Sequence, residues 1–290
     1  KQGPYSTPLL DFIYDAHDQF DFFIFFTYLY APTFFGLPLV SDKAILVPTA
    51  HDEPYLKLPV FRSLFHLPQA IVYNTEPERA HVHKITGNQG VPGLVAGVGI
   101  NVPDDVSGKR FRQKFDISSD FVLYVGRVHE SKNVPELIDY FLRYQKQTGR
   151  NLKLVLLGKV EIPIPDHPNL LPLGFVSEKD KFDAMRAATL LIVPSQYESL
   201  SMVVLEAWRM NIPALVNGRC SVLRYQCLQS NGGLYYFTYD DFSIALSILL
   251  DDPTLRQKLG CQGRKFAVRH YDWDIIMAKY QAIFSALAYS

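Results

Sequence analysis

Apolar residues along this chain follow two alternating patterns. Short, mostly apolar runs recur, such as Phe121–Val125 and Thr189–Val193, and such runs are typical of strands buried on both faces of a parallel sheet. Between them lie longer segments with apolar residues at helical spacing, such as Val134–Lys146. The alternation predicts parallel sheets whose strands are joined by crossover helices.

The same pattern divides the chain into two parts. The other strand candidates are Phe22–Phe26, Ala44–Pro48, Ala70–Tyr73, Gly93–Val98, Leu152–Leu157, Leu170–Leu173 and Pro213–Val216. The stretch Asn101–Asp120 is rich in polar and charged residues, so we place the link between two domains there. A length of 290 residues fits two domains of about 150 residues each. We expect a first domain over residues 1–103, a second over 104–273, and a last helix within 274–290.

The most informative segment follows the strand candidate Thr189–Val193. It runs from Pro194 to Trp208 and contains Glu198 and Glu206 with seven residues between them. We expect a tight turn and then a helix that starts near Ser199. The first turn of such a helix has unpaired backbone N–H groups and the positive end of the helix dipole, which suit a phosphate. The two carboxylates flank that place and could accept hydroxyl groups from both ends of a nucleotide-linked sugar.

A second segment points to the same kind of ligand. The strand candidate Phe121–Val125 leads into Gly126, Arg127 and Lys132, and the helix 134–146 follows. Glycine allows a sharp turn at the strand end, and the two cations offer donors suited to phosphate oxygens. Taken alone, both cations would be interpreted as ordinary solvated surface charges.

Together the two segments resemble the signature of retaining glycosyltransferases with the GT-B fold, the family-four group also called glycosyl transferases group 1. That signature has two Glu separated by seven residues, preceded by a Gly-Arg pair and a Lys five residues after the Arg. Ser199 and Leu200 stand where Gly or Phe is more frequent after the first Glu.

The resemblance implies a role for each matching residue. In the family the Gly-Arg pair and the Lys clamp the donor diphosphate and stabilise the departing nucleotide, which implies Gly126, Arg127 and Lys132 here. The first Glu holds sugar hydroxyls beside the anomeric carbon, and the second accepts the ribose hydroxyls, which implies Glu198 and Glu206. Further donor contacts are implied at Ser199, Leu200, Ser201 and Met202, and, for the base and ribose, at Gly174 and Phe175.

His51 is the candidate from the first domain. It follows the strand candidate Ala44–Pro48, and open parallel sheets bind ligands at the carboxyl ends of their strands. His51 resembles the histidine that lies beside the transferred sugar in the family. The other histidines are interpreted as surface or internally satisfied residues.

The resemblance also implies the architecture. It implies two Rossmann-like, doubly wound α/β domains, an acceptor-side domain over 1–103 and a nucleotide-sugar domain over 104–273, with the last helix crossing back onto the first. The family's first domain is larger and opens with a Gly-rich acceptor loop, which the segment Gly3-Pro4-Tyr5 lacks. We expect that the first domain is truncated and that the natural protein begins upstream, which leaves the activity of this chain alone open.

Composition limits which classes of partner and cofactor the protein is expected to bind. The formal net charge is zero, so nothing indicates general nucleic-acid binding. Three cysteines without metal-binding spacing are typical of free thiols in a cytoplasmic protein. The acidic pairs Asp104-Asp105 and Asp251-Asp252 are not an Asp-x-Asp motif, so we expect activity without a metal and no tightly bound cofactor. The oligomeric state is not predicted.

The segment Phe22–Val40 has no charged residue over nineteen positions, close to the length of a membrane span. Pro32, Gly36 and Pro38 interrupt it, so we predict a buried strand and then an irregular aromatic loop rather than a transmembrane helix. Contact of the loop with lipid, at the inner membrane face, or with a sugar remains an alternative to core packing.

The sequence therefore predicts a retaining glycosyltransferase that moves a sugar from a nucleoside-diphosphate sugar to a glycan, glycolipid or small-molecule acceptor. A non-catalytic nucleotide-sugar-binding module, a nucleotide-sugar epimerase and a phosphorylase of the same fold are the alternatives. A nicotinamide oxidoreductase is disfavoured because no Gly-x-Gly-x-x-Gly follows a strand. Two local predictions are a helix cap at Ser177 with Asp180, and a loop at Asn231–Gly233.

Overall fold

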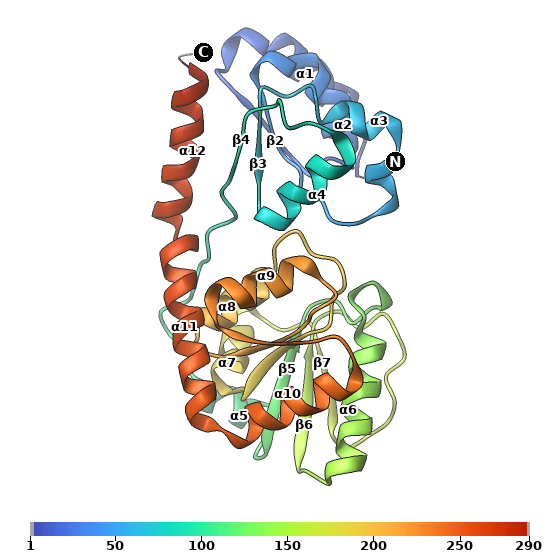
Figure 1. Cartoon of the computed structure of the whole chain (residues 1–290), viewed down its shortest axis with the longest axis vertical. Coiled ribbons are helices and arrows are strands. Elements are labelled where there is room, and N and C mark those ends of the chain that lie inside the picture. Colours follow the sequence, from blue (N-terminus) through green and yellow to red (C-terminus); the bar gives the residue numbers. More distant parts are fainter. Residues whose placement is uncertain (1–2, 289–290) are drawn as a thin grey trace. The chain divides into compact units, whose positions relative to one another are not determined.

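The structure is a computed structural model that describes residues 3–288. The chain folds into two compact units (Figure 1). The first unit contains the chain up to Gly99, the short segment Glu198–Leu200, and the chain from Trp273 onward. The second contains Ile100–Tyr197 and Ser201–Asp272.

The first unit is built on a four-stranded parallel sheet with the strand order β1-β2-β3-β4. The strands are β1 (Phe23–Phe26), β2 (Ala44–Val47), β3 (Ala70–Tyr73) and β4 (Gly93–Val95). Its α-helices are α1 (Thr7–Asp15), α2 (Ala31–Gly36), α3 (Pro59–Leu64), α4 (Glu76–Thr86) and α12 (Trp273–Ala288).

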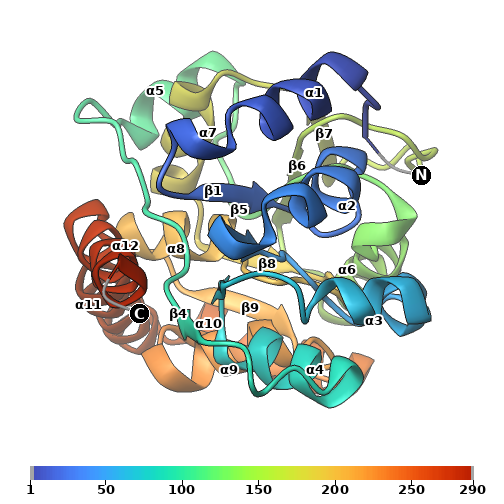
Figure 2. The same cartoon turned by 90° about the horizontal axis from the view of Figure 1, so that it is seen from above.

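Alternate residues of these strands build two separate cores. Leu46 and Ile71 point to one face of the sheet, where they pack with large aromatic side chains such as Tyr28. Ile45 and Val72 point to the other face and pack against α12. The end of the chain therefore completes the first unit, and both views show α12 running beside β4 (Figure 1 and Figure 2).

The second unit is built on a six-stranded parallel sheet with the order β10-β9-β8-β5-β6-β7. The strands are β5 (Asp120–Val125), β6 (Leu152–Leu157), β7 (Leu170–Gly174), β8 (Leu190–Val193), β9 (Ala214–Asn217) and β10 (Gly233–Tyr236). Its α-helices are α5 (Gly108–Lys114), α6 (Val134–Thr148), α7 (Glu178–Ala187), α8 (Met202–Arg209), α9 (Ser221–Ser230), α10 (Tyr239–Asp251) and α11 (Pro253–Tyr271). The prediction of two parallel-sheet α/β domains is confirmed.

The aromatic loop predicted after Phe26 is wrong. The segment forms the helix α2 and then a 3-10 helix, Leu37–Lys43. Pro32 lies in the first turn of α2, where the missing N–H has no helical partner to lose, and this is why it starts a helix instead of breaking one. In the described part of the chain no helix is both long and apolar enough to cross a bilayer.

The loop predicted at Asn231–Gly233 is also wrong in part. Asn231 adopts a left-handed conformation at the end of α9, but Gly233 begins the strand β10 and pairs with Ala214. A Cβ at Gly233 would lie 2.1 Å from the carbonyl oxygen of Ala214. Glycine is therefore needed here for close strand packing, which the sequence pattern did not distinguish from a turn.

The helix predicted to start near Ser199 begins later, at Met202, with Ser201 at its N-cap position. The backbone carbonyl of Ser199 accepts a hydrogen bond from the Thr75 hydroxyl, at 3.0 Å, and Glu198–Leu200 belongs to the first unit. A contact distant in sequence thus holds these residues out of the helix.

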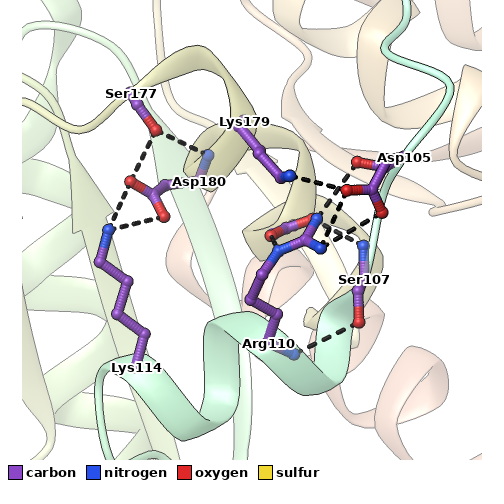
Figure 3. A network of polar contacts seen from close by, with 8 residues as sticks. Asp105, Ser107, Arg110, Lys114, Ser177, Lys179 and Asp180 are labelled. Carbon is purple, nitrogen blue, oxygen red and sulfur yellow. Dashed lines mark hydrogen bonds and ion pairs between the residues drawn. The ribbon is translucent and has the colours of Figure 1, made fainter.

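The link predicted at 101–120 contains a helix, α5, that packs on α7 through charged side chains (Figure 3). The buried carboxylate of Asp183 accepts hydrogen bonds from Arg110 Nε at 2.5 Å and Nη2 at 2.8 Å, and from the Ser107 backbone N–H at 2.6 Å. Arg110 also contacts Asp105, which Lys179 approaches to 2.6 Å. A segment this polar forms a helix because its charges are paired with a neighbouring helix.

A second, exposed contact joins the same helices. Ser177 caps α7 as predicted, since its hydroxyl accepts the Asp180 backbone N–H at 3.1 Å. The Asp180 carboxylate accepts from Lys114 at 2.8 Å and from the Ser177 hydroxyl, and these bonds, with the Ser177 backbone N–H, lower the pKa of Asp180.

We expect Arg110→Met to destabilise the second unit strongly, because the buried Asp183 carboxylate would lose its charged partner. The expected fall in Tm is on the order of 10 °C. Lys114→Met, the matched control, removes an exposed ion pair on the same helix and should lower Tm by about 2 °C or less. Thermal unfolding followed by circular dichroism measures both, and equal shifts would contradict the role given to Asp183.

Candidate functional site

The strand order of the second unit reverses between β5 and β8. From β5 the chain continues outward through β6 and β7, and after β8 it continues the other way through β9 and β10. Open parallel sheets bind ligands in the crevice beyond the carboxyl ends of the strands at such a switch point. Gly126 and Arg127 follow β5, and Pro194 and Ser195 follow β8, so both predicted segments begin at this point.

Three glycines form a row where β5, β6 and β7 end. The Gly126 N–H donates to the Leu157 carbonyl at 2.9 Å, and the Gly158 N–H donates to the Gly174 carbonyl at 2.8 Å. All three glycines have positive φ, at 149°, 134° and 71° for Gly126, Gly158 and Gly174. A Cβ at Gly158 would lie 2.0 Å from the Gly126 carbonyl oxygen. Side chains are thereby excluded from a strip of backbone that a ligand can approach closely.

Two asparagine side chains tie the loops of the switch point together. The Nδ2 atoms of Asn133 and Asn217 donate to the carbonyl oxygen of Pro194, at 3.2 and 2.9 Å. Asn133 lies between Lys132 and the helix α6, and Asn217 is the last residue of β9. The loops after β5, β8 and β9 therefore share one acceptor, which fixes the backbone that bears Lys132.

The N-terminus of α8 follows Pro194 by a few residues. Ser201 is the N-cap residue, yet its side chain accepts no capping hydrogen bond. Its hydroxyl is buried and has no hydrogen-bond partner in the described part of the chain. A helix N-terminus with free backbone N–H groups and a buried, unused hydroxyl can bind an anion.

Glu206 lies in the second turn of α8 and pairs with a lysine that the sequence did not point to. Lys181 Nζ on α7 approaches Glu206 Oε1 to 2.9 Å, and the Glu206 side chain is 15% exposed. Burial raises the pKa of Glu206, and the bond from Lys181 opposes that rise. The carboxylate is thus held in place by Lys181 while part of it still reaches solvent.

The other predicted residues of the second unit differ in exposure. Arg127 is exposed, and its backbone carbonyl accepts a hydrogen bond from the Tyr124 hydroxyl at 2.7 Å. Lys132 is half-buried at the end of a short 3-10 turn. Phe175 follows Gly174 and its ring is 89% exposed, which is unusual for so large an apolar side chain.

In the first unit, His51 lies four residues after the end of β2 and is half-buried. The residue before it, Ala50, donates its backbone N–H to Glu78 Oε1 at 2.6 Å. Glu78 Oε2 accepts the backbone N–H of Asn74 at 2.5 Å. Burial raises the pKa of Glu78 to about 8, although the backbone N–H groups favour its charged form. Glu78 was not singled out from the sequence, because Thr75-Glu76-Pro77-Glu78 has the pattern of an ordinary capping box.

The structure divides the predicted residues between the two units. His51, Glu198, Ser199 and Leu200 belong to the first, where Ser199 contacts Asn74 and Thr75. The second contains the remaining residues, which are Gly126, Arg127, Lys132, Gly174, Phe175, Ser201, Met202 and Glu206. Within the described residues no group of three or more His, Cys, Asp or Glu side chains could hold a metal ion.

Comparison with known proteins shows the family of the chain. The family model described as glycosyl transferases group 1 matches residues 107–266, which is more than half of the chain. The glycosyltransferase CapM of capsular polysaccharide biosynthesis from Staphylococcus aureus is 24% identical over 182 residues, covering 58% of this chain and 47% of CapM. The chain spans about half the length of the curated relatives it matches.

Solved structures show the same fold. Sucrose-phosphate synthase from Thermosynechococcus elongatus aligns with a TM-score of 0.80 and 16% identity, covering 97% of this chain and 78% of that one. HepE from Anabaena, solved in complex with UDP, aligns with a TM-score of 0.78 and 14% identity, covering 96% of this chain and 82% of HepE.

The raised pKa of Glu78 predicts a pH-dependent stability. In the folded protein the carboxyl keeps its proton up to about pH 8, but in the unfolded chain it releases it near the ordinary value of 4.5. The contribution is therefore fully present below pH 4.5 and is lost as pH rises through 8. Between pH 5 and 9 the free energy of unfolding should fall less in Glu78→Gln than in the unsubstituted protein, by on the order of 3 kcal/mol. Urea unfolding at several pH values measures this difference.

Glu76→Gln is the matched control, because it removes a charge from the same helix but leaves the hydrogen bonds to the Ala50 and Asn74 N–H groups in place. If Glu78→Gln keeps the full pH slope of the unsubstituted protein, Glu78 is ionised at neutral pH and the expectation is wrong.

Proposed function

Because the chain belongs to the family of glycosyl transferases group 1, we propose that it transfers a sugar from a nucleoside-diphosphate sugar to a glycan, glycolipid or small-molecule acceptor. In this proposal the sugar keeps its anomeric configuration and no metal ion takes part. The observation that carries the proposal is the switch point of the second unit, where a glycine row adjoins a helix N-terminus with a buried, unused hydroxyl at Ser201.

The diphosphate binds at this switch point. Arg127 presents a fork of N–H donors and Lys132 a compact positive charge, and both follow β5. The backbone N–H groups at the start of α8, with the Ser201 hydroxyl, add uncharged donors. Charge builds up on the departing diphosphate, so cations and dipoles already held in position lower the barrier to transfer.

The nucleoside is held by side chains farther along the same sheet edge. Glu206 accepts the ribose hydroxyls, and the 2.9 Å contact with Lys181 keeps its carboxylate oriented. Gly174 brings backbone close to the nucleoside, and the exposed Phe175 ring offers a face on which a base can stack.

The transferred sugar is contacted by residues of the first unit. Glu198 accepts sugar hydroxyls beside the anomeric carbon, and His51 donates a hydrogen bond to the sugar. The acceptor attacks from the face that the diphosphate leaves, and the departing phosphate takes the acceptor's proton. The carbon–oxygen bond to phosphate breaks and the new glycosidic bond forms on the same face of the anomeric carbon, so the configuration is retained.

A non-catalytic nucleotide-sugar-binding module is the second candidate. It is supported by the same family match, since residues 107–266 contain the proposed diphosphate-binding residues. This candidate has the same donor-binding residues but no turnover. A nucleotide-sugar epimerase of the same fold would instead convert its donor without any acceptor.

We expect the protein to bind one of UDP, GDP and ADP in preference to the others, and Arg127→Ala to weaken that binding. Loss of charge-assisted hydrogen bonds to phosphate should raise Kd roughly tenfold to a hundredfold. Isothermal titration calorimetry measures this directly. Arg150→Ala is the matched control, because Arg150 precedes β6 at the opposite edge of the same sheet and pairs with Asp251. If both substitutions have equal effects, or if neither has an effect, Arg127 does not bind the diphosphate.

The nucleotide sugar chosen by that titration serves as donor in the second test. We expect transfer in EDTA at the rate seen without it, and a product whose anomeric proton in NMR shows the configuration of the donor. Transfer lost in EDTA and restored by Mn²⁺ would contradict the metal-free mechanism, and an inverted product would contradict retention. Hydrolysis or epimerisation of the donor as the sole reaction would contradict transfer itself.

A further inference from the structure

We propose that Glu78 is a positioning residue for the transfer reaction. Its buried carboxylate joins the backbone of Ala50 to that of Asn74, and thereby sets the place of His51. The inference rests on the proposed function, because His51 has its role only there.

The geometry around Glu78 joins three elements. One carboxylate oxygen accepts the Ala50 N–H after β2, and the other accepts the Asn74 N–H directly after β3. Glu78 itself lies in the first turn of α4, where its own N–H donates to the Thr75 hydroxyl at 3.2 Å. All four residues are buried, so water does not compete for these bonds.

This arrangement goes beyond an ordinary helix cap. In a capping box the glutamate bonds the backbone N–H of the N-cap residue itself, which would be Thr75. The backbone N–H of Thr75 does favour the charged form of Glu78, but the two carboxylate oxygens also accept the N–H groups of Asn74 and of Ala50, and Ala50 lies in the loop after β2. A carboxylate that only capped α4 would not need to reach the loop before His51.

The same loop is fixed from its other side by strained backbone. Thr49 and Thr27 both have positive φ, at 50° and 66°, and these values are unusual for β-branched residues. Their hydroxyls are hydrogen-bonded to each other at 2.9 Å, which joins the ends of β1 and β2. Such strain persists where surrounding contacts over-determine the conformation, and it is concentrated at functional sites. Ala50 is thus held between the threonine pair and Glu78.

The consequence reaches two residues of the proposed reaction. Ala50 directly precedes His51, so a shift of this backbone moves the imidazole. Asn74 and Thr75 contact Ser199, the neighbour of Glu198, through Asn74 Nδ2 at 3.4 Å and the Thr75 hydroxyl at 3.0 Å. A misplacement of about 1 Å can lower a rate about a hundredfold. Loss of the Glu78 hydrogen bonds can therefore lower the rate by displacing the residues of the first unit that contact the sugar.

The test is a double-mutant cycle between Glu78→Gln and His51→Ala. Glutamine keeps the shape but has one acceptor oxygen, so its amide group would face a backbone N–H. Above pH 8, where the carboxylate is charged and both of its oxygens accept, we expect Glu78→Gln to lower kcat roughly tenfold to a hundredfold with nucleotide Kd changed less than twofold. In the His51→Ala background the same substitution should lower kcat less than threefold, because the group it positions is gone.

Asp183→Asn is the matched control. Asp183 is also a buried carboxylate that accepts a backbone N–H, but it lies in the second unit. We expect it to lower Tm while changing kcat by the same factor with or without His51, when both are measured well below Tm. If Glu78→Gln behaves in this additive way, its role is only structural and the inference is overturned.

An observation that does not depend on activity separates this inference from the proposed function. Above pH 8, where the carboxylate is charged, the Ala50 and Asn74 amide protons should resonate far downfield in NMR and move upfield in Glu78→Gln, and the His51 ring resonances should shift with them. Unshifted His51 resonances would overturn the positioning role. Absence of transfer with all these shifts present would instead overturn the proposed function.

Discussion

The structure depends on one constraint, which is that parallel strands end with backbone groups that the sheet can no longer pair. In the second unit this is met by a glycine row, whose N–H and carbonyl groups bond across β5, β6 and β7, and by two asparagine amides on the Pro194 carbonyl. In the first unit a carboxylate meets it, because Glu78 accepts the N–H groups after β2 and β3. Three of the proposed site residues, Gly126, Lys132 and His51, lie on the loops that these bonds hold.

Three carboxylates with reduced exposure show how partners decide what such a group does. Both oxygens of Asp183 accept hydrogen bonds, from Arg110 and from a backbone N–H, and these bonds hold α5 on α7. Glu78 has backbone partners alone, and its burial raises its pKa to about 8. Glu206 is paired with Lys181 and keeps part of its surface in solvent, as its proposed role toward the ribose hydroxyls requires.

The sequence pattern was sufficient for the strands β1 to β9 and for the switch-point segments, but it missed β10. Residue runs such as Ala70–Tyr73 and Leu152–Leu157 coincide with strands, because fully buried parallel strands need continuous apolar residues. The pattern failed where a residue's partner lies far away in the sequence. It missed α5, whose charges are paired with α7, and it started α8 too early, because Thr75 holds Ser199 out of the helix. No local signal marked Lys181, Asn133 or Asn217 as part of a site, and the local pattern around Glu78 indicates only a helix cap.

By itself, the sequence determined the family, the two parallel-sheet domains and the glycine and cation that follow β5, since each of these depends on neighbouring residues or on short spacing. Only the tertiary structure decided which unit each candidate belongs to, and that Glu198 and Glu206 are divided between the two. It also decided which amides Glu78 bonds. Hydrogen bonds and burial depend on distances in space, and chain folding sets these distances between residues that no sequence pattern connects.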